Sequence, residues 1–199
     1  MIKLKIIGLS GGSGTGKGYV GKMFSEHGIT VIDTDAVYRN LVSSGSECLS
    51  ELALAFGKEI ISPDGSLNRP LLAKLAFSSP ERHKLLNTIT HSHVLRAVRE
   101  IIKKLEEDGA QAVIVDAPML FESGFDKECD FIIGMVAPDA VRISRIMERD
   151  GISKERAEER IRVQLTSNEI EKRCDAVIYN DKDSELSSRV GELCDKILN

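Results

Sequence analysis

The chain has 199 residues, of which 42% are hydrophobic and 29% are charged. These values exclude a disordered or fibrous chain, and the length suits one domain with an insertion better than two independent domains. The formal net charge of −4 argues against a general nucleic-acid or anionic-membrane surface, so any phosphate binding is expected to be local.

Apolar segments of strand length recur along the chain and predict buried parallel strands. Near-continuous runs of Ile and Val are typical of strands that are covered on both faces. The predicted strands span residues 3–9, 29–33, 112–117, 130–136 and 175–179. Helical patterns separate them, and an amphipathic helix is predicted over residues 184–198. The sequence therefore predicts an α/β three-layer fold with a five-stranded parallel sheet.

A glycine-rich loop after the first predicted strand is the strongest signal in the sequence. Residues 11–17 match G-x-x-x-x-G-K, a pattern in which backbone N–H groups and a helix dipole bind phosphates and the lysine contacts the β- and γ-phosphates. The candidate ATP-binding residues here are Gly12, Ser13, Gly14, Thr15, Gly16, Lys17 and Gly18. Gly18 stands where a Ser or Thr hydroxyl normally coordinates Mg²⁺, so the usual metal anchor is missing.

Two aspartates follow the second predicted strand. Asp33 and Asp35 lie at its carboxyl end, where open α/β sheets bind ligands, and strand alternation predicts that both face the same side. Phosphoryl transfer to an alcohol needs a carboxylate to accept the hydroxyl proton and oxygen ligands for Mg²⁺, and the two aspartates can divide these tasks. The alternative is that one of them only caps a helix that begins near Ala36.

About eighty residues separate the second and third predicted strands, many more than one crossover helix needs, so an insertion is predicted. It contains a long helix over residues 85–105, with a break near His91 left open. The predicted boundaries within a single domain of residues 1–199 are 1–40 and 107–199 for the core, about 41–106 for the insertion and about 146–170 for a lid.

Arginines recur between residues 141 and 164, where a turn at residues 150–153 divides two predicted helices. They are Arg142, Arg145, Arg149, Arg156, Arg160 and Arg162. A planar guanidinium binds phosphate oxygens with two donors and stays charged, so arginine suits a lid that closes over ATP. Arg145 and Arg149 are predicted to bind phosphate, whereas the others alternate with glutamates and are predicted to be solvated.

Further motifs accompany the loop along almost the whole chain. They are His27-Gly28, Val31-Ile32-Asp33-x-Asp35, Leu67-Asn68-Arg69, Leu86-Asn87-x-Ile89-x-His91, the run from Pro118 to Gly124, Arg145-x-x-x-Arg149-Asp150, Arg160-Ile161-x-x-Gln164 and Asp175-x-Val177-Ile178-x-Asn180. Their order and spacing resemble the dephospho-coenzyme A kinases, a family of P-loop nucleotide kinases. The resemblance implies a helical coenzyme-binding insertion, a short helical lid, and transfer of the ATP γ-phosphate to the ribose 3′-hydroxyl of dephospho-coenzyme A.

The resemblance also implies roles for single residues. Asp35 matches the family's proposed base, and Asp33 is the neighbour that aids Mg²⁺, which either aspartate could bind. Lys17 and Arg145 match the charges that stabilise the transferring phosphoryl group. Asn180 matches the strand end that approaches the adenine. The residues on acceptor-side motifs are Arg69, His91, Pro118, Leu120 and Glu122.

Two departures from the family pattern keep alternatives open. Gly18-Tyr19 replaces the usual Ser-Thr pair, and Ser92 replaces the proline that normally follows the histidine. The alternatives are another P-loop kinase acting on a nucleoside or nucleotide, and a nucleotide-binding protein whose catalysis is impaired at Gly18.

The expected partners are ATP and dephospho-coenzyme A, with Mg²⁺ as cofactor, no nucleic acid, no membrane and a monomeric state. No apolar run reaches the roughly 18 residues of a membrane span, so a cytoplasmic location is expected. The cysteines form no C-x-x-C pair, so reduced, mostly buried thiols are expected rather than a zinc site or disulfides. They are Cys48, Cys129, Cys174 and Cys194.

Overall fold

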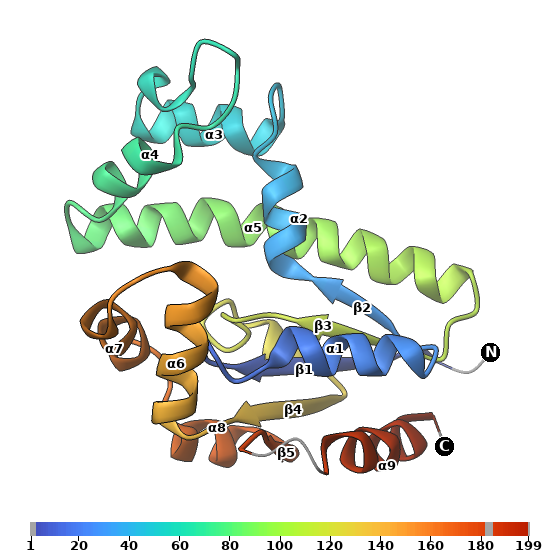
Figure 1. Cartoon of the computed structure of the whole chain (residues 1–199). Helices are drawn as coiled ribbons and strands as arrows, with labels where there is room; N and C mark the ends of the chain where they lie inside the picture. The colour runs from blue at the N-terminus through green and yellow to red at the C-terminus, as the bar shows by residue number, and fades with distance from the viewer. Residues whose placement is uncertain (1–2, 182–184, 199) are drawn as a thin grey trace. The chain divides into compact units, whose positions relative to one another are not determined.

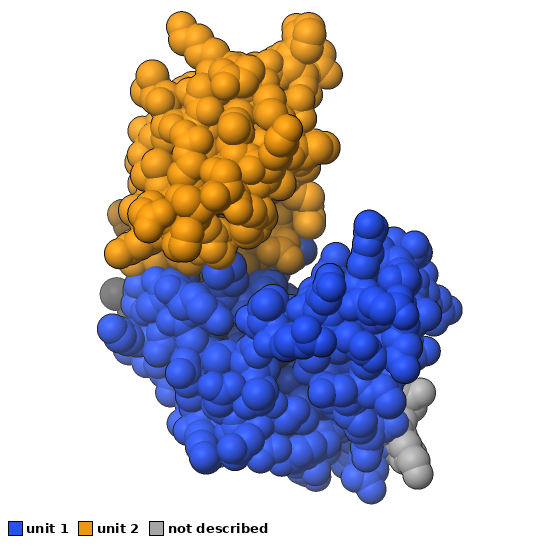
Figure 2. All heavy atoms as spheres, turned by 90° about the vertical axis from the view of Figure 1, so that its left-hand side faces the viewer, with its two compact units in different colours: residues 1–33, 105–199 blue, residues 34–104 orange. Residues whose placement is uncertain are grey.

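The computed structural model of the chain describes residues 3–181 and 185–198 (Figure 1). The chain divides into two compact units (Figure 2). The first contains the residues up to 33 and those from 105 onward, and the second contains residues 34–104. The second unit therefore includes residues 34–40, which the sequence analysis assigns to the core.

The first unit contains an all-parallel sheet of five strands, as predicted. The strands are β1 Lys5–Gly11, β2 Thr30–Asp33, β3 Ala112–Asp116, β4 Phe131–Val136 and β5 Ala176–Tyr179, in the order β2-β3-β1-β4-β5. Ile114 and Ile133 of the inner strands are fully buried, as expected where helices cover both faces. β1 runs on to Gly11 rather than ending at residue 9, so the first glycine of the loop pattern belongs to the strand.

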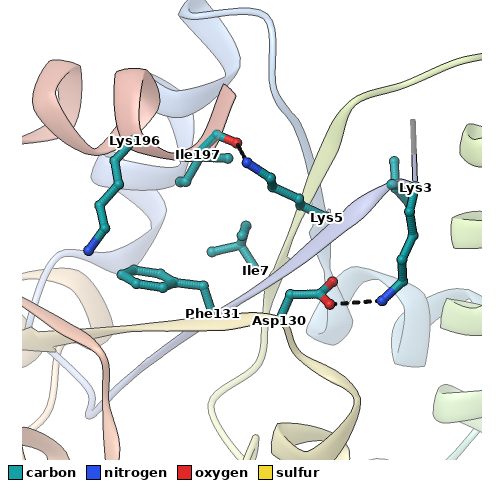
Figure 3. Close-up of a pocket in the computed structure, with 8 residues that line it drawn as sticks. Lys3, Lys5, Ile7, Asp130, Phe131, Lys196 and Ile197 are labelled. Carbon is teal, nitrogen blue, oxygen red and sulfur yellow. Dashed lines mark hydrogen bonds and ion pairs between the residues drawn. The ribbon is translucent and has the colours of Figure 1, made fainter. Parts of the chain in front are cut away.

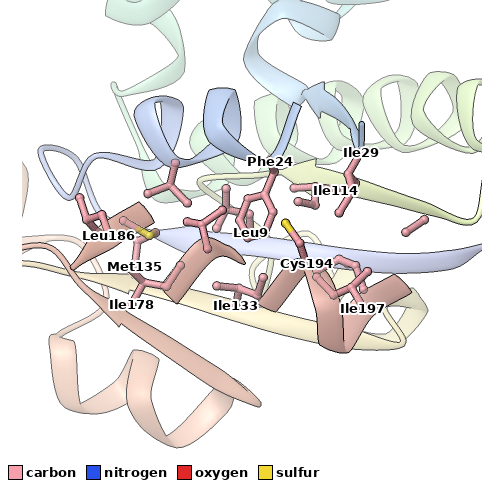
Figure 4. Close-up of a cluster of buried hydrophobic side chains, with 14 residues drawn as sticks. Leu9, Phe24, Ile29, Ile114, Ile133, Met135, Ile178, Leu186, Cys194 and Ile197 are labelled. Carbon is pink, nitrogen blue, oxygen red and sulfur yellow. The ribbon is translucent and has the colours of Figure 1, made fainter. Parts of the chain in front are cut away.

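Helices pack on both faces of this sheet. The helices of this unit are α1 Lys17–Glu26, α6 Asp139–Asp150, α7 Lys154–Arg162, α8 Ser167–Arg173 and α9 Leu186–Leu198, with the short 3-10 helix η2 Phe125–Glu128; of these, α1 and α9 cover one face of the sheet and α8 packs on the other. Phe24 of α1 and Leu186 of α9 share a buried cluster with Ile133 of β4 (Figure 4). The next residue of β4, Gly134, points to the opposite face, where Ile170 of α8 covers it. The predicted start of the last helix at residue 184 lies outside the described residues.

The helices of the segment that is predicted to form a lid change direction at the expected turn. Gly151 follows α6 with a φ of 63°, the left-handed conformation that commonly ends a helix. Ser153 then begins α7, and its Oγ accepts a hydrogen bond from the N–H of Arg156. Thr166 and Glu169 form a capping box at the start of α8, so three short helices follow β4.

The second unit is helical and has its own apolar core. Its elements are α2 Thr34–Leu41, α3 Glu47–Phe56, η1 Lys58–Ile60, α4 Arg69–Ala76 and most of α5 Pro80–Glu107. Leu52 of α3 and Leu72 of α4 pack in this core with Ile89 of α5. α5 is unbroken, so the break considered near His91 does not occur. Ile89 packs into the core just before this position, and burial of an apolar face stabilises a helix. Among the described residues, no helix is long and apolar enough to cross a membrane.

A buried histidine connects α3 to α5. His93 is 4% exposed, its Nε2 lies 2.6 Å from Oε2 of Glu51, and its Nδ1 lies 3.0 Å from Nη2 of Arg96. A guanidinium only donates hydrogen bonds, so Nδ1 must accept, and Nε2 carries the proton that is donated to Glu51. The histidine therefore has a structural role in the second unit, which the sequence analysis does not identify.

The cysteines are free thiols, as predicted. Cys48 and Cys194 are buried, whereas Cys129 and Cys174 are half-buried. Burial raises the pKa of Cys48 to about 11, of Cys129 to about 12 and of Cys174 to about 11. These thiols therefore stay protonated at neutral pH.

The contact between β4 and α8 predicts the effect of one substitution. In Gly134→Ala the added Cβ would lie 2.6 Å from Cγ2 of Ile170, so the free energy of unfolding should fall by roughly 1–3 kcal/mol, the usual cost of overpacking. Gly191 of α9 has no atom within 4 Å of an added Cβ, so Gly191→Ala is the matched control. It should raise stability by up to about 1 kcal/mol, because alanine favours helix over glycine. Urea denaturation measures both, and equal midpoints would contradict the packing.

Candidate active site

The glycine-rich loop joins the end of β1 to the start of α1. Gly14 and Gly16 have φ values of +77° and +92°, in the left-handed region that favours glycine. Space is limited as well, because a Cβ on Gly14 would overlap the backbone of Arg142 and one on Gly16 would overlap the side-chain amide of Asn180. Both glycines are therefore required by their backbone conformation and by their neighbours.

Lys17, the first residue of α1, is held at this loop. Its Nζ donates a 2.8 Å hydrogen bond to the carbonyl of Gly11 and lies 3.9 Å from Oδ1 of Asp116. Both charged side chains are mostly buried, with 12% of Lys17 and 15% of Asp116 exposed. The ammonium is therefore already at the loop where a P-loop lysine meets the β- and γ-phosphates.

Asp116 is a site residue that the sequence analysis missed. It ends β3, where it is the register partner of Asp33 on β2 and of Leu9 on β1. The carboxyl ends of the strands thus bring two carboxylates to the edge of the sheet where the loop begins. The available signal was an apolar strand that ends in aspartate at residue 116, the same pattern as at residue 33.

The expected alternation of Asp33 and Asp35 is wrong. Asp33 ends β2, but α2 begins at Thr34, two positions before Ala36, so Asp35 lies in the first turn of a helix. Strand alternation does not apply across this boundary. Both aspartates are exposed, and the helix dipole favours a carboxylate in the first turn of α2.

Arg142 of α6 is buried rather than solvated, which corrects the prediction. It is 3% exposed, its Nε donates to the carbonyl of Ser13 at 3.0 Å, and its Nη1 donates to Asp139 at 3.0 Å. Its Nη2 donates to Oε1 of Gln164 at 2.8 Å. A buried guanidinium needs such acceptors for its donors, and none of them could be identified from helical spacing alone.

Arg145 and Asn180 meet on the other side of the loop. The Nη1 of Arg145 lies 3.3 Å from the carbonyl of Gly14, and its Nη2 lies 3.3 Å from Oδ1 of Asn180. Asn180 is 3% exposed, and its Nδ2 donates to the carbonyl of Thr15 at 2.9 Å. Asn180 therefore supports the loop in this structure, and its contact with adenine stays a prediction.

Arg149 is not at the loop. Its exposed guanidinium forms two hydrogen bonds, of 2.7 and 2.9 Å, with the carboxylate of Asp150. Arg160 of α7 bonds the same carboxylate. Hydrogen bonds from these two arginines, chiefly Arg149, lower the pKa of Asp150 to about 2, so the group is ionised at neutral pH. Arg156 is exposed, as predicted for the solvated arginines.

The segment after β3 contains one buried candidate residue. Leu120 is fully buried, and its side chain packs against Gly8 of β1, so it has a packing role, and its contact with a substrate stays a prediction. Pro118 and Glu122 are exposed. The ring of Phe121 lies 5.2 Å from the guanidinium of Arg173, within the range of a cation–π contact.

The remaining candidates for acceptor binding belong to the second unit. Arg69 begins α4, and its guanidinium lies 5.7 Å from the centre of the Tyr38 ring on α2. This contact falls within cation–π range. His91 is half-buried on α5. The roles of both residues stay predictions.

A cavity of about 370 Å³ lies at the other end of the sheet (Figure 3). Lys3, Lys5 and Phe131 line it, near the amino ends of β1 and β4. Its lysines already have partners, since Lys3 pairs with Asp130 at 2.9 Å and Lys5 donates to a backbone carbonyl of α9. Because ligands of parallel sheets bind at the carboxyl ends of the strands, this cavity is not the phosphate site.

The chain matches known proteins over most of its length. Residues 5–185 match the family model described as dephospho-CoA kinase. A dephospho-CoA kinase of Carboxydothermus hydrogenoformans is 36% identical over 180 residues, which cover 90% of this chain and 87% of that protein. The same enzyme of Corynebacterium glutamicum is 34% identical over 196 residues, which cover 96% of this chain and 98% of that protein. The crystal structure of the protein TT1252 from Thermus thermophilus is similar over 98% of both chains, with a TM-score of 0.87 and 32% identity.

Proposed function

The chain belongs to the dephospho-CoA kinase family and is an ATP-dependent kinase, and we propose from this premise how its residues divide the reaction. The reaction moves the γ-phosphate of ATP to the ribose 3′-hydroxyl of dephospho-coenzyme A and gives coenzyme A and ADP. The observation that carries the proposal is the position of Lys17 and Arg145 at the glycine-rich loop, with Asp33 and Asp116 at neighbouring strand ends.

The loop and two cations are proposed to bind the phosphates of ATP. Phosphoryl transfer depends mainly on positioning and on neutralising charge at the phosphoryl oxygens. Backbone N–H groups of the loop bind the β- and γ-phosphates, except that of Ser13, which already donates to Gln164, and Lys17 exchanges the carbonyl of Gly11 for a phosphate oxygen. Arg145 adds a second cation from the opposite side. Arg149 is a secondary phosphate contact, because its guanidinium must first break its hydrogen bonds with Asp150.

The acceptor side is proposed to centre on Asp35. As the bond between the γ-phosphorus and the leaving ADP oxygen breaks and the bond to the 3′-oxygen forms, Asp35 accepts the hydroxyl proton. Arg69 supplies a cation for the anionic groups of dephospho-coenzyme A, and His91 supplies a hydrogen-bonding side chain. Pro118 and Glu122 contribute exposed surface after β3.

Mg²⁺ fits the donor set at the ends of β2 and β3. Among the described residues, no group of three or more His, Cys, Asp or Glu side chains could hold a metal alone. Mg²⁺ in kinase sites takes only one or two carboxylates and is completed by water and phosphates, so Asp33, Asp116 or Asp35 suffices. The bound ion would neutralise charge on the phosphates. Gly18 has no atom within 4 Å of an added Cβ, which leaves room for water in place of the missing hydroxyl.

Gly18 is also the observation that favours a second candidate, a nucleotide-binding protein with impaired catalysis. Both candidates bind ATP at the loop, but only a kinase consumes it in proportion to an acceptor. The monomeric state and the cytoplasmic location remain predictions.

An acceptor screen tests the proposed reaction. ATP consumption is measured with dephospho-coenzyme A, cytidylate, adenylate and shikimate, and coenzyme A is detected directly as product. Turnover is expected with dephospho-coenzyme A. Lys17→Ala is the inactive control and should lose turnover because Lys17 acts at the phosphates, and a cooperative melting transition checks that the variant still folds. ATP binding without turnover on any acceptor would favour the non-catalytic candidate.

Asp35→Asn should lower kcat by roughly 10²-fold or more, the range for loss of a general base, with little change in ATP affinity. Asp33→Asn is the matched comparison, because it removes the neighbouring carboxylate while Asp35 remains. Steady-state kinetics on both variants decide the assignment. A larger loss of kcat in Asp33→Asn would show that the two roles are reversed.

Gly18→Ser should lower the Mg²⁺ concentration needed for half-maximal activity, because it restores a hydroxyl ligand where the structure leaves room for it. The measurements are Mg²⁺ titrations of activity and of ADP binding for wild type and variant. Gly18→Ala is the control, because it adds the Cβ without the oxygen. Identical titrations for all three proteins would show that the hydroxyl is already replaced.

A further inference from the structure

The phosphate loop is bound on its outer side by two residues to which the reaction gives no direct role. Arg142 of α6 and Gln164, which lies just after α7, form one network with Ser13. We propose that this pair, the loop clamp, is a positioning device that holds the loop in its phosphate-binding conformation and so sets the affinity for nucleotide polyphosphates. The inference rests on the proposed binding of ATP by the loop.

The side-chain amide of Gln164 forms hydrogen bonds with Ser13 through both its oxygen and its nitrogen. Its Oε1 accepts the backbone N–H of Ser13 at 2.9 Å, and its Nε2 donates to Oγ of Ser13 at 2.9 Å. The same Oε1 accepts from Nη2 of Arg142 at 2.8 Å. One amide thus fixes the backbone and the side chain of a loop residue, and its own orientation is fixed by the arginine.

Arg142 is the second residue of the loop clamp. Its Nε donates to the carbonyl of Ser13, so the pair binds both the N–H and the C=O of one residue. The contact is close, because a Cβ on Gly12 would overlap Nη2 of Arg142. The carboxylate of Asp139 accepts a hydrogen bond from Nη1 of Arg142 at 3.0 Å. The planar guanidinium of Arg142 can reach these three separate acceptors in only one orientation. The ammonium group of a lysine at this position could not bind all three.

A glycine-rich loop needs this support because its backbone is otherwise free to adopt many conformations. Without the clamp the binding-competent conformation is a smaller fraction of the free protein, and the apparent affinity falls by that fraction. The loss should appear in the binding of phosphates at the loop and not in the binding of the acceptor. This difference separates positioning from general stability.

The test compares four variants with the wild type by ADP calorimetry, by KM for each substrate and by melting temperature. Gln164→Ala should raise the Kd for ADP and the KM for ATP about tenfold, the effect of losing one or two hydrogen bonds, with KM for dephospho-coenzyme A unchanged. Gln164→Glu should recover most of the affinity, because its carboxylate can accept from Ser13 and Arg142. Arg142→Lys should resemble Gln164→Ala. Arg162→Ala, at an exposed arginine of α7, is the control and should match the wild type.

Wild-type ADP affinity in Gln164→Ala would overturn the clamp, and so would an equal rise of both KM values or a failure of Gln164→Glu to recover affinity. Failure of the wild-type protein to bind ADP would overturn the nucleotide function and the clamp with it. Binding by the wild type with unchanged affinity in Gln164→Ala would overturn the clamp alone.

Discussion

The conformation of the loop at residues 11–17 has to be imposed by its neighbours, because its glycines have few internal restraints. The sheet order makes this possible. β1 lies in the centre, so the loop at its end has β3 on one side and β4 on the other. Asp116 arrives from β3, whereas Asn180 follows β5, and its backbone N–H is held by Val136 at the end of β4. Each support comes from a different part of the chain.

Arg142 and Arg145 both lie near the loop, but they differ in burial and in the length of their hydrogen bonds. Arg142 is buried, and its hydrogen bonds measure 2.8 to 3.0 Å, as expected of a group that stays in place. Arg145 makes contacts of 3.3 to 3.5 Å with oxygen atoms of the loop and of Asn180. Such long bonds are weak, so phosphate oxygens can replace them at little cost. A charged residue close to a binding site is therefore not necessarily one that touches the ligand.

The parts of the fold that could be predicted from the sequence are those that local patterns determine. Apolar runs identified every strand, and Gly151 with Ser153 marked the turn between α6 and α7 because each acts on its own helix end. Arg142 was missed because its burial depends on Ser13, which lies 129 positions away in the sequence. The packing role of Leu120 was missed for a similar reason, since its partner Gly8 belongs to a distant strand.

Lys17 lies at the glycine-rich loop, as its motif predicts, whereas the contact of Asn180 with adenine stays a prediction. The expectation that Asp35 faces the same side as Asp33 was wrong because strand alternation was carried past residue 33, where β2 ends and α2 begins. Asp116, like Asp33, ends an apolar strand. No second aspartate follows it two positions later, so the sequence analysis did not single it out. The sequence therefore named candidate residues for the site but not the contacts that support them, which are almost all long-range.

The burial of the cysteines has a consequence for an enzyme whose product carries a thiol. The disulfide of coenzyme A can exchange with a free protein cysteine, which forms a mixed disulfide and releases one coenzyme A thiol, and the attacking species is the protein thiolate. With a pKa of about 11 for Cys48 and Cys174 and about 12 for Cys129, only roughly one thiol in ten thousand or fewer is ionised at pH 7. These three cysteines are therefore poor nucleophiles toward the disulfide of coenzyme A.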